Sequence, residues 1–144
     1  MIPTLAGIKF NSLDLYEFQR CRHVLGGKYD IVFGTDELYA AARALGARGF
    51  IGSTYNYQPE LYYRIDRAFD RGDWKAVEEG MQKVCRSVEL LVRYGGVACG
   101  KALMAARGIN VGDPRLPLGA LSPEQKQSIL LKYKALMQDE FPCL

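Results

Sequence analysis

Three short apolar runs, separated by stretches with helical spacing, occupy the first third of the sequence. They cover residues 5–10, 29–33 and 49–54, and glycines lie beside or within them. Runs of this length with few charges are typical of strands that are buried on both faces of a sheet. Residues 13–25 and 38–45 between them have the spacing and composition of helices. The pattern therefore predicts parallel βα units with short connections.

The remainder of the sequence predicts helices without further strands. Four helices are expected, over residues 60–71, 74–94, 97–107 and 123–140. The prolines of residues 113–118 exclude both a helix and a central strand in that segment. We therefore expect about residues 1–58 to form βα units and about residues 59–144 to be helical.

Composition and charge exclude several classes of protein. The chain has 144 residues, a formal net charge of +3 and no basic stripe with interleaved aromatic residues, so a nucleic-acid partner is not expected. No apolar run approaches the length of a membrane-spanning helix, and the N-terminus lacks the pattern of a secretory signal. These features predict a cytoplasmic protein that does not bind membranes.

The cysteines support the same location. Cys21, Cys85, Cys99 and Cys143 lie far apart in the sequence and none forms a CxxC pair. Widely spaced cysteines of this kind are typical of free thiols in a reducing compartment. The sequence therefore predicts neither disulfides nor a zinc site.

Lys9 ends the first apolar run and is the first candidate for chemistry. In a strand its side chain would share a face with Leu5 and Gly7. Burial there would lower the pKa of the ammonium and make the amine a nucleophile toward a carbonyl. A lysine at a strand end is more often solvated, however, so spacing alone leaves both interpretations open.

Polar residues also follow the other two apolar runs. Asp36 and Glu37 come after the second run, and Ser53 and Thr54 end the third. Because the carboxyl ends of parallel strands share one edge, we expect these side chains to converge with Lys9. Two structural alternatives remain: the acids could cap a helix, and the hydroxyls could stabilise a turn.

The motifs at these strand ends resemble those of the N-acetylneuraminate lyases. Gly7-Ile8-Lys9-Phe10, Gly34-Thr35-Asp36-Glu37 and Gly52-Ser53-Thr54-Tyr55-Asn56 resemble the ends of strands six, seven and eight of that family. Pro114-Arg115-Leu116-Pro117-Leu118 is also similar, most of all to the animal form. The family belongs to the pyruvate-dependent class I aldolases, which include dihydrodipicolinate synthase. The resemblance implies a partial TIM (β/α)8 barrel, with three parallel βα units followed by a C-terminal helical region.

The resemblance also implies the reaction. Lys9 would form a Schiff base with pyruvate or with the keto carbon of open-chain N-acetylneuraminate, and cleavage would give N-acetylmannosamine and pyruvate. The residues that would contact the substrate are Asn11, Gly34 through its backbone, Asp36, Glu37 and Ser53. Asn11 occupies a place where the family often has threonine or serine, and either Asn11 or Ser12 could instead cap the following helix. No metal or diffusible cofactor is implied, and the family's tetramer predicts a homo-oligomer.

The length of the chain keeps other functions open. A complete (β/α)8 barrel needs about 250 residues, and this chain begins at what resembles strand six. It would lack the loop that binds the pyruvate carboxylate and the strand-five tyrosine that transfers the proton. The chain could be part of a lyase, a non-catalytic fragment that serves as an interaction module, or part of a related aldolase for another keto acid.

Overall fold

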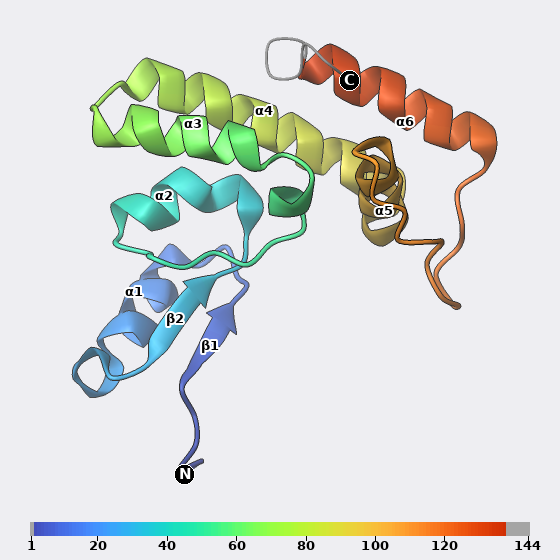
Figure 1. Ribbon diagram of the computed structural model, residues 1–144. Coiled ribbons are helices and arrows are strands. Elements are labelled where there is room, and N and C mark those ends of the chain that lie inside the picture. The colour runs from blue at the N-terminus through green and yellow to red at the C-terminus, as the bar shows by residue number, and fades with distance from the viewer. Residues whose placement is uncertain (1, 138–144) are drawn as a thin grey trace. The chain divides into compact units, whose positions relative to one another are not determined.

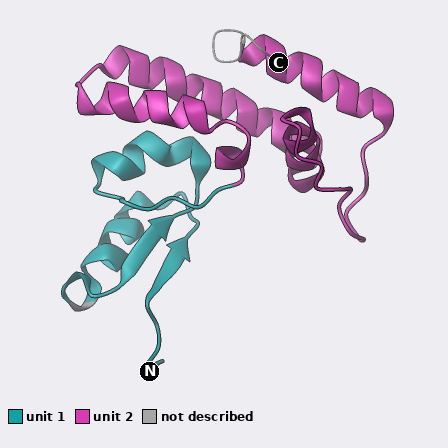
Figure 2. Ribbon diagram, in the orientation of Figure 1, with its two compact units in different colours: residues 1–52 teal, residues 53–144 magenta. Residues whose placement is uncertain are grey.

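The computed structural model describes residues 2–137, except for the side chain of Leu25. The chain forms two compact units, Met1–Gly52 and Ser53–Leu144 (Figure 2). The first unit contains the strands, and the second is helical in its described part. Each unit has its own packing and is considered separately below.

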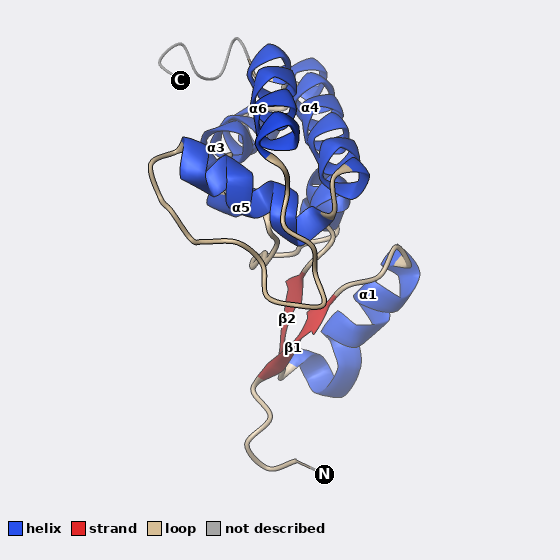
Figure 3. Cartoon of the chain, turned by 90° about the vertical axis from the view of Figure 1, so that its right-hand side faces the viewer, coloured by secondary structure: helices blue, strands red, loops and turns tan. Residues whose placement is uncertain are grey.

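The first unit is built from two βα units. Its elements are β1 (Gly7–Phe10), α1 (Leu15–His23), the 3₁₀ helix η1 (Val24–Gly27), β2 (Asp30–Phe33), the 3₁₀ helix η2 (Asp36–Leu38) and α2 (Tyr39–Ala44). β1 and β2 pair in parallel, with Gly7 opposite Asp30 and Phe10 opposite Phe33 (Figure 3). The predicted parallel pairing of the first two strands is therefore confirmed.

The third expected strand is reduced to one bridged residue. Phe50 pairs with Phe33 in parallel as an isolated bridge. The Phe33 N–H donates to the Gly49 carbonyl and the Ile51 N–H to the Phe33 carbonyl, both at 2.9 Å. Because glycine weakens a strand interior, Gly49 and Gly52 leave only a short segment able to pair. Residues 49–51 thus follow the predicted order, but they do not form the full strand expected over residues 49–54.

The core of the first unit lies on one side of its sheet. Phe18 from α1 and Phe33 from β2 are fully buried, and their ring centroids lie 4.9 Å apart in an edge-to-face arrangement. Phe10 packs against both rings. The opposite face of β1 is open, since Lys9 on that face is exposed, and even Ile8, on the same face as Phe10, remains 44% exposed. The prediction that all strands are buried on both faces is therefore wrong for β1, because β2 is its only strand neighbour among the described residues.

The second unit packs four helices around a separate core. Its elements are the 3₁₀ helix η3 (Thr54–Asn56), α3 (Pro59–Asp70), α4 (Trp74–Arg93), α5 (Gly96–Ala106) and α6 (Pro123–Leu136) (Figure 1). The expected helices are confirmed to within a residue or so at all the ends that the structure describes. The expected end of the last helix at residue 140, and Cys143, lie outside the described residues.

Local sequence explains where the helices of the second unit begin and how two of them pack. Asp73 caps α4 by accepting from the Ala76 N–H at 3.1 Å, and Ser122 forms a capping box at the start of α6. Gly80 allows α4 to lie against α3, because a Cβ there would come within 2.5 Å of Ile65 Cγ1.

No helix within residues 2–137 is long and apolar enough to span a membrane.

Candidate active site

Lys9 lies near the carboxyl end of β1, where the apolar pattern predicted it. Its side chain is exposed, so the expectation of a buried, desolvated lysine is wrong for this chain. The physical reason is the open side of β1, which no described residue of the first unit covers. The side chain lies over the backbone of Gly34, which directly follows β2.

Gly34 brings Lys9 and Asn11 together. A Cβ built on Gly34 would collide with Lys9 Cε and would lie 2.8 Å from Asn11 Oδ1. The two polar side chains therefore occupy the space that a side chain at residue 34 would fill. The Gly34 N–H already donates to the Phe10 carbonyl at 2.8 Å. A hydrogen bond from the Gly34 backbone to a ligand would therefore use its carbonyl oxygen.

Asn11 does not cap α1. The N-cap is Asp14, whose carboxylate accepts from the Glu17 N–H at 3.0 Å. Ser12 in turn accepts from the Asp14 N–H at 3.1 Å. The suggestion that Asn11 or Ser12 caps this helix is wrong, because the carboxylate three residues before Glu17 has the required geometry. The Asn11 amide is therefore directed to the group around Gly34 and not to the helix end.

Asp36 and Glu37 form the first turn of η2. The N-cap of η2 is Thr35, and it makes no side-chain hydrogen bond to the helix, so simple capping does not explain the two acids. Asp36 is only 6% exposed, whereas Glu37 is half-buried. The Asp36 carboxylate lies over Gly52, where a Cβ would overlap its Oδ1. The structure thus fixes this carboxylate beside the segment that follows the bridged residue Phe50.

Ser53 begins the second unit, directly after Gly52. Its side chain is exposed and makes no capping hydrogen bond, although the residue is the N-cap of η3. Thr54 is different: it is buried, and its Oγ1 lies 2.6 Å from the Tyr62 hydroxyl in α3. The Thr54 hydroxyl therefore joins η3 to α3, whereas the Ser53 side chain is exposed.

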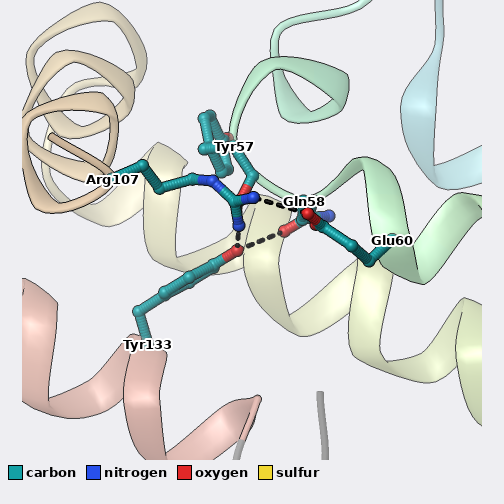
Figure 4. Close-up of polar contacts among 5 residues, drawn as sticks. All are labelled: Tyr57, Gln58, Glu60, Arg107 and Tyr133. Atoms are coloured by element: carbon teal, nitrogen blue, oxygen red, sulfur yellow. Dashed lines mark hydrogen bonds and ion pairs between the residues drawn. The ribbon is translucent and has the colours of Figure 1, made fainter. Parts of the chain in front are cut away.

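The second unit contains a polar cluster that the sequence pattern did not reveal. It consists of Tyr57, Gln58, Glu60, Arg107 and Tyr133, and Figure 4 shows these side chains meeting between helices. The Tyr57 carbonyl accepts from Arg107 Nη1 at 3.3 Å and from the Tyr133 hydroxyl at 3.2 Å. In the sequence, Arg107 lies 50 positions and Tyr133 lies 76 positions after Tyr57. The local signal was a glutamine, Gln58, at the N-cap of a helix whose first residue is proline.

Burial governs the protonation of this cluster. Burial raises the pKa of the Tyr133 phenol well above its ordinary value, so the hydroxyl stays protonated and keeps its role as a donor. Arg107 pairs with the Glu60 carboxylate at 2.5 Å. Both charged groups are partly exposed, so this ion pair is not a fully buried one.

Metal ligands do not gather in the described part of the chain. Within residues 2–137, no group of three or more His, Cys, Asp or Glu side chains is placed to hold a metal ion. The chemistry available around Gly34 is that of an amine, an amide and nearby carboxylates.

The sequence matches the Dihydrodipicolinate synthetase family over residues 1–136. The chain belongs to this family. Its described fold agrees with that membership: the parallel strands and following helices form part of the α/β architecture of these (β/α)8 barrels.

Individual members of the family give the closer comparison. The chain is 36% identical over 138 residues to an N-acetylneuraminate lyase from Pongo abelii, covering 94% of this chain and 43% of that protein. The solved structure of Proteus mirabilis N-acetylneuraminate lyase is 52% identical, with a TM-score of 0.90, covering 94% of this chain and 46% of that chain. Identity to the bacterial structure is thus higher than identity to the animal protein, while the likeness of residues 114–118 to the animal form stays a prediction.

A third family member is described as having a catalytic lysine. The solved structure of a catalytic lysine mutant of Ruminococcus gnavus sialic acid aldolase is 27% identical, with a TM-score of 0.77, covering 89% of this chain and 43% of that chain. The chain spans less than half the length of each of these three relatives.

Proposed function

We propose that this chain supplies the Schiff-base lysine and the sugar-binding carboxylates of an N-acetylneuraminate lyase. The enzyme would cleave N-acetylneuraminate to N-acetylmannosamine and pyruvate. The observation that carries the proposal is the meeting of Lys9 and Asn11 over Gly34, at the carboxyl ends of two parallel strands. The 52% identity to the Proteus mirabilis lyase supports the choice of substrate.

Lys9 is the proposed nucleophile. The first unit has two lysines, and the other, Lys28, follows η1 at the opposite end of the strands. The Ruminococcus gnavus aldolase has a catalytic lysine, which supports assigning the role to a lysine here. In a complete barrel the open side of β1 would be covered, and desolvation would then favour the neutral, nucleophilic amine.

The chemistry would proceed through an iminium ion. The Lys9 amine adds to the substrate's keto carbon and water leaves, which gives a protonated Schiff base. A base removes a hydroxyl proton from the substrate, the carbon–carbon bond breaks, and its electrons neutralise the iminium to form an enamine. The new aldehyde leaves, the enamine carbon takes up a proton, and hydrolysis releases pyruvate and restores Lys9.

The remaining candidate residues would bind the polyhydroxy part of the substrate. Asp36 and Glu37 would accept hydrogen bonds from sugar hydroxyls, and such charge-assisted bonds are the stronger kind. The Ser53 hydroxyl, the Asn11 amide and the Gly34 carbonyl would add neutral hydrogen bonds. The burial of Asp36 against Gly52 supports this role, because a fixed carboxylate discriminates between substrates better than a mobile one.

A second candidate is an aldolase of the same family that acts on another keto acid. The family match favours it, because that match extends to the dihydrodipicolinate synthetases as a class. Both candidates use Lys9 in the same way and differ only in the aldehyde that the carboxylates select. Comparing the aldehydes that react with the enzyme-bound enamine of pyruvate would distinguish them.

Borohydride trapping tests the proposal. The chain would be fused to the N-terminal half of the Proteus mirabilis lyase, since that relative extends well beyond the matched region. Borohydride with pyruvate should then reduce one Schiff base, and peptide mass spectrometry should find it at Lys9. Lys9→Arg should abolish the adduct, whereas the matched Lys28→Arg should keep it. An adduct that survives Lys9→Arg would disprove the assignment.

Cofactors, assembly and location complete the proposal. The covalent link to Lys9 supplies the electron sink, so the reaction would need no metal or diffusible cofactor, and dialysis against a chelator should leave it unchanged. We further propose a homo-oligomer, which sedimentation of the fusion protein would measure. A cytoplasmic location remains a prediction from the cysteine pattern.

A further inference from the structure

Residues 53–58 are a short connection that begins at Ser53 and leads into α3. Hydrogen bonds join this connection to the helices of the second unit. We propose that Arg107 and Tyr133 are positioning residues that hold this connection, and with it the Ser53 hydroxyl, in place for the sugar half of the substrate. The inference rests on the proposed function of Ser53. It goes beyond that function by giving a specificity role to two residues far along the chain.

The backbone carbonyl of Tyr57 is the central contact. It accepts from Arg107 Nη1 at 3.3 Å, at the C-cap of α5, and from the Tyr133 hydroxyl at 3.2 Å, in α6 (Figure 4). Both lone pairs of a carbonyl oxygen can be used in this way. Two side chains that follow Tyr57 by 50 and 76 positions in the sequence therefore fix the same backbone atom.

The residues on either side of Tyr57 are anchored as well. Gln58 is fully buried, and its Oε1 accepts from the Ser87 hydroxyl of α4 at 2.7 Å and from Tyr133 at 3.4 Å. Thr54 is also buried and bonds to the Tyr62 hydroxyl of α3. The connection is thus linked to all four helices of the unit, whereas the Ser53 side chain itself stays exposed.

The chemistry of the two positioning side chains suits a rigid contact. Arg107 serves two acceptors at once, the Tyr57 carbonyl and the Glu60 carboxylate in the first turn of α3. The planar guanidinium can do this with separate N–H groups, which a lysine cannot reproduce in the same geometry. Tyr133 is buried, so its phenol remains a protonated donor across the ordinary pH range.

Removing the Tyr133 donor should therefore loosen the connection without dismantling the unit. Tyr133→Phe keeps the ring and the apolar contacts but leaves the Tyr57 carbonyl with one donor fewer. Tyr94→Phe is the matched control. The Tyr94 hydroxyl also contacts α6, at Ser128 and Lys132, but neither contact involves residues 53–58.

Hydrogen exchange tests the physical contact in the 144-residue chain. Tyr133→Phe should speed amide exchange in residues 53–58 by about 2- to 10-fold, the range expected for one neutral hydrogen bond. Exchange in the middle of α4 should stay unchanged, and Tyr94→Phe should leave residues 53–58 unchanged. Equal exchange of residues 53–58 in the wild type and Tyr133→Phe would overturn the inference.

Kinetics of the fusion protein test the functional consequence. Tyr133→Phe should raise KM for N-acetylneuraminate by about 2- to 10-fold while borohydride trapping of pyruvate at Lys9 stays unchanged. Arg107→Lys should act in the same direction. A purely structural role would lower trapping and cleavage together, and that result would also overturn the inference.

The two measurements fail independently. Absence of a Lys9 adduct in the unsubstituted fusion protein would disprove the proposed function, and with it the role of Ser53 in binding sugar. Normal trapping together with an unchanged KM in Tyr133→Phe would leave the proposed function intact and disprove only the positioning role.

Discussion

The carboxylate of Asp36 lies directly over the backbone of Gly52. A Cβ at residue 52 would overlap Asp36 Oδ1, so no other residue type could occupy this position without moving the carboxylate. The sequence separates the two residues by a helix, and the short parallel bridge between Phe33 and Phe50 brings them together. Gly34 has the same relationship with Lys9 and Asn11. The candidate site is therefore built on two glycines as much as on its polar groups.

Alanine at either glycine should disturb the site. We expect Gly52→Ala to reduce the free energy of unfolding by about 1–3 kcal/mol, because the added methyl group overlaps the buried Asp36 carboxylate. Gly34→Ala should cost less stability, because the exposed Lys9 side chain can move aside. Urea denaturation would measure this loss. Gly119→Ala is the matched control, since nothing lies within 4 Å of a Cβ there, and it should change stability little. Equal stability of all three variants would contradict the close approaches.

Neutralising Asp36 or Glu37 should weaken cleavage of the substrate but not formation of the Schiff base with pyruvate. In the fusion protein, Asp36→Asn or Glu37→Gln should weaken N-acetylneuraminate cleavage by about 1–3 kcal/mol in transition-state terms, the usual scale for a hydrogen bond to a charged group. Borohydride trapping with pyruvate should change little, because these acids would contact only the sugar part. An equal loss of trapping and cleavage would mean that the acids stabilise the fold instead.

Cys99 should make the stability of the second unit sensitive to alkaline pH. The thiol is fully buried, and burial raises its pKa to about 11 from an ordinary value near 9. Between these values the folded chain holds a proton that the unfolded chain releases. The free energy of unfolding should therefore fall as the pH rises from 9 to 11. Denaturation curves at several pH values would measure the fall, and Cys99→Ala should reduce it.

Thiol labelling gives an independent check on the burial of Cys99. Iodoacetamide should modify the exposed Cys85 well before Cys99 in the folded chain. Rapid labelling of Cys99 at neutral pH, without unfolding, would contradict its burial.

The 144-residue chain alone should not cleave N-acetylneuraminate at a useful rate. A Schiff base activates the substrate, but positioned proton transfer contributes about 100- to 10,000-fold more, and none of the proposed site residues is assigned that task. The Lys9 side chain is also exposed to water in this chain. A coupled assay for pyruvate would test this, and normal turnover by the isolated chain would contradict it.

The same chain should also self-associate. Large apolar side chains of the first unit remain exposed, among them Ile8 at 44%, Leu13 at 71% and Ile51 at 54%. Exposed apolar groups and an unpaired strand edge favour association. Analytical ultracentrifugation should detect oligomers or aggregates, and a monomer at all concentrations would disprove the expectation.

The sequence by itself determined the helices and the first two strands, but not that the third expected strand shrinks to one bridged residue. Periodicity separated strands from helices because strand and helix bury side chains at different intervals. Local capping groups such as Asp73 and Ser122 explain where two of the helices begin, because a cap needs only residues that are neighbours in the sequence. Lys9 was also found in this way, since a polar residue at the end of an apolar run is a local feature.

Only the tertiary structure decided the surroundings of those residues. The exposure of Lys9 depends on what covers β1, and no local pattern contains that information. The space above Gly34 and Gly52 depends on side chains from other elements. Tyr57 contacts Arg107, which lies 50 positions later in the sequence, and Tyr133, which lies 76 positions later. Such contacts arise when helices pack, so the residues that hold Ser53 could be recognised only in the folded chain.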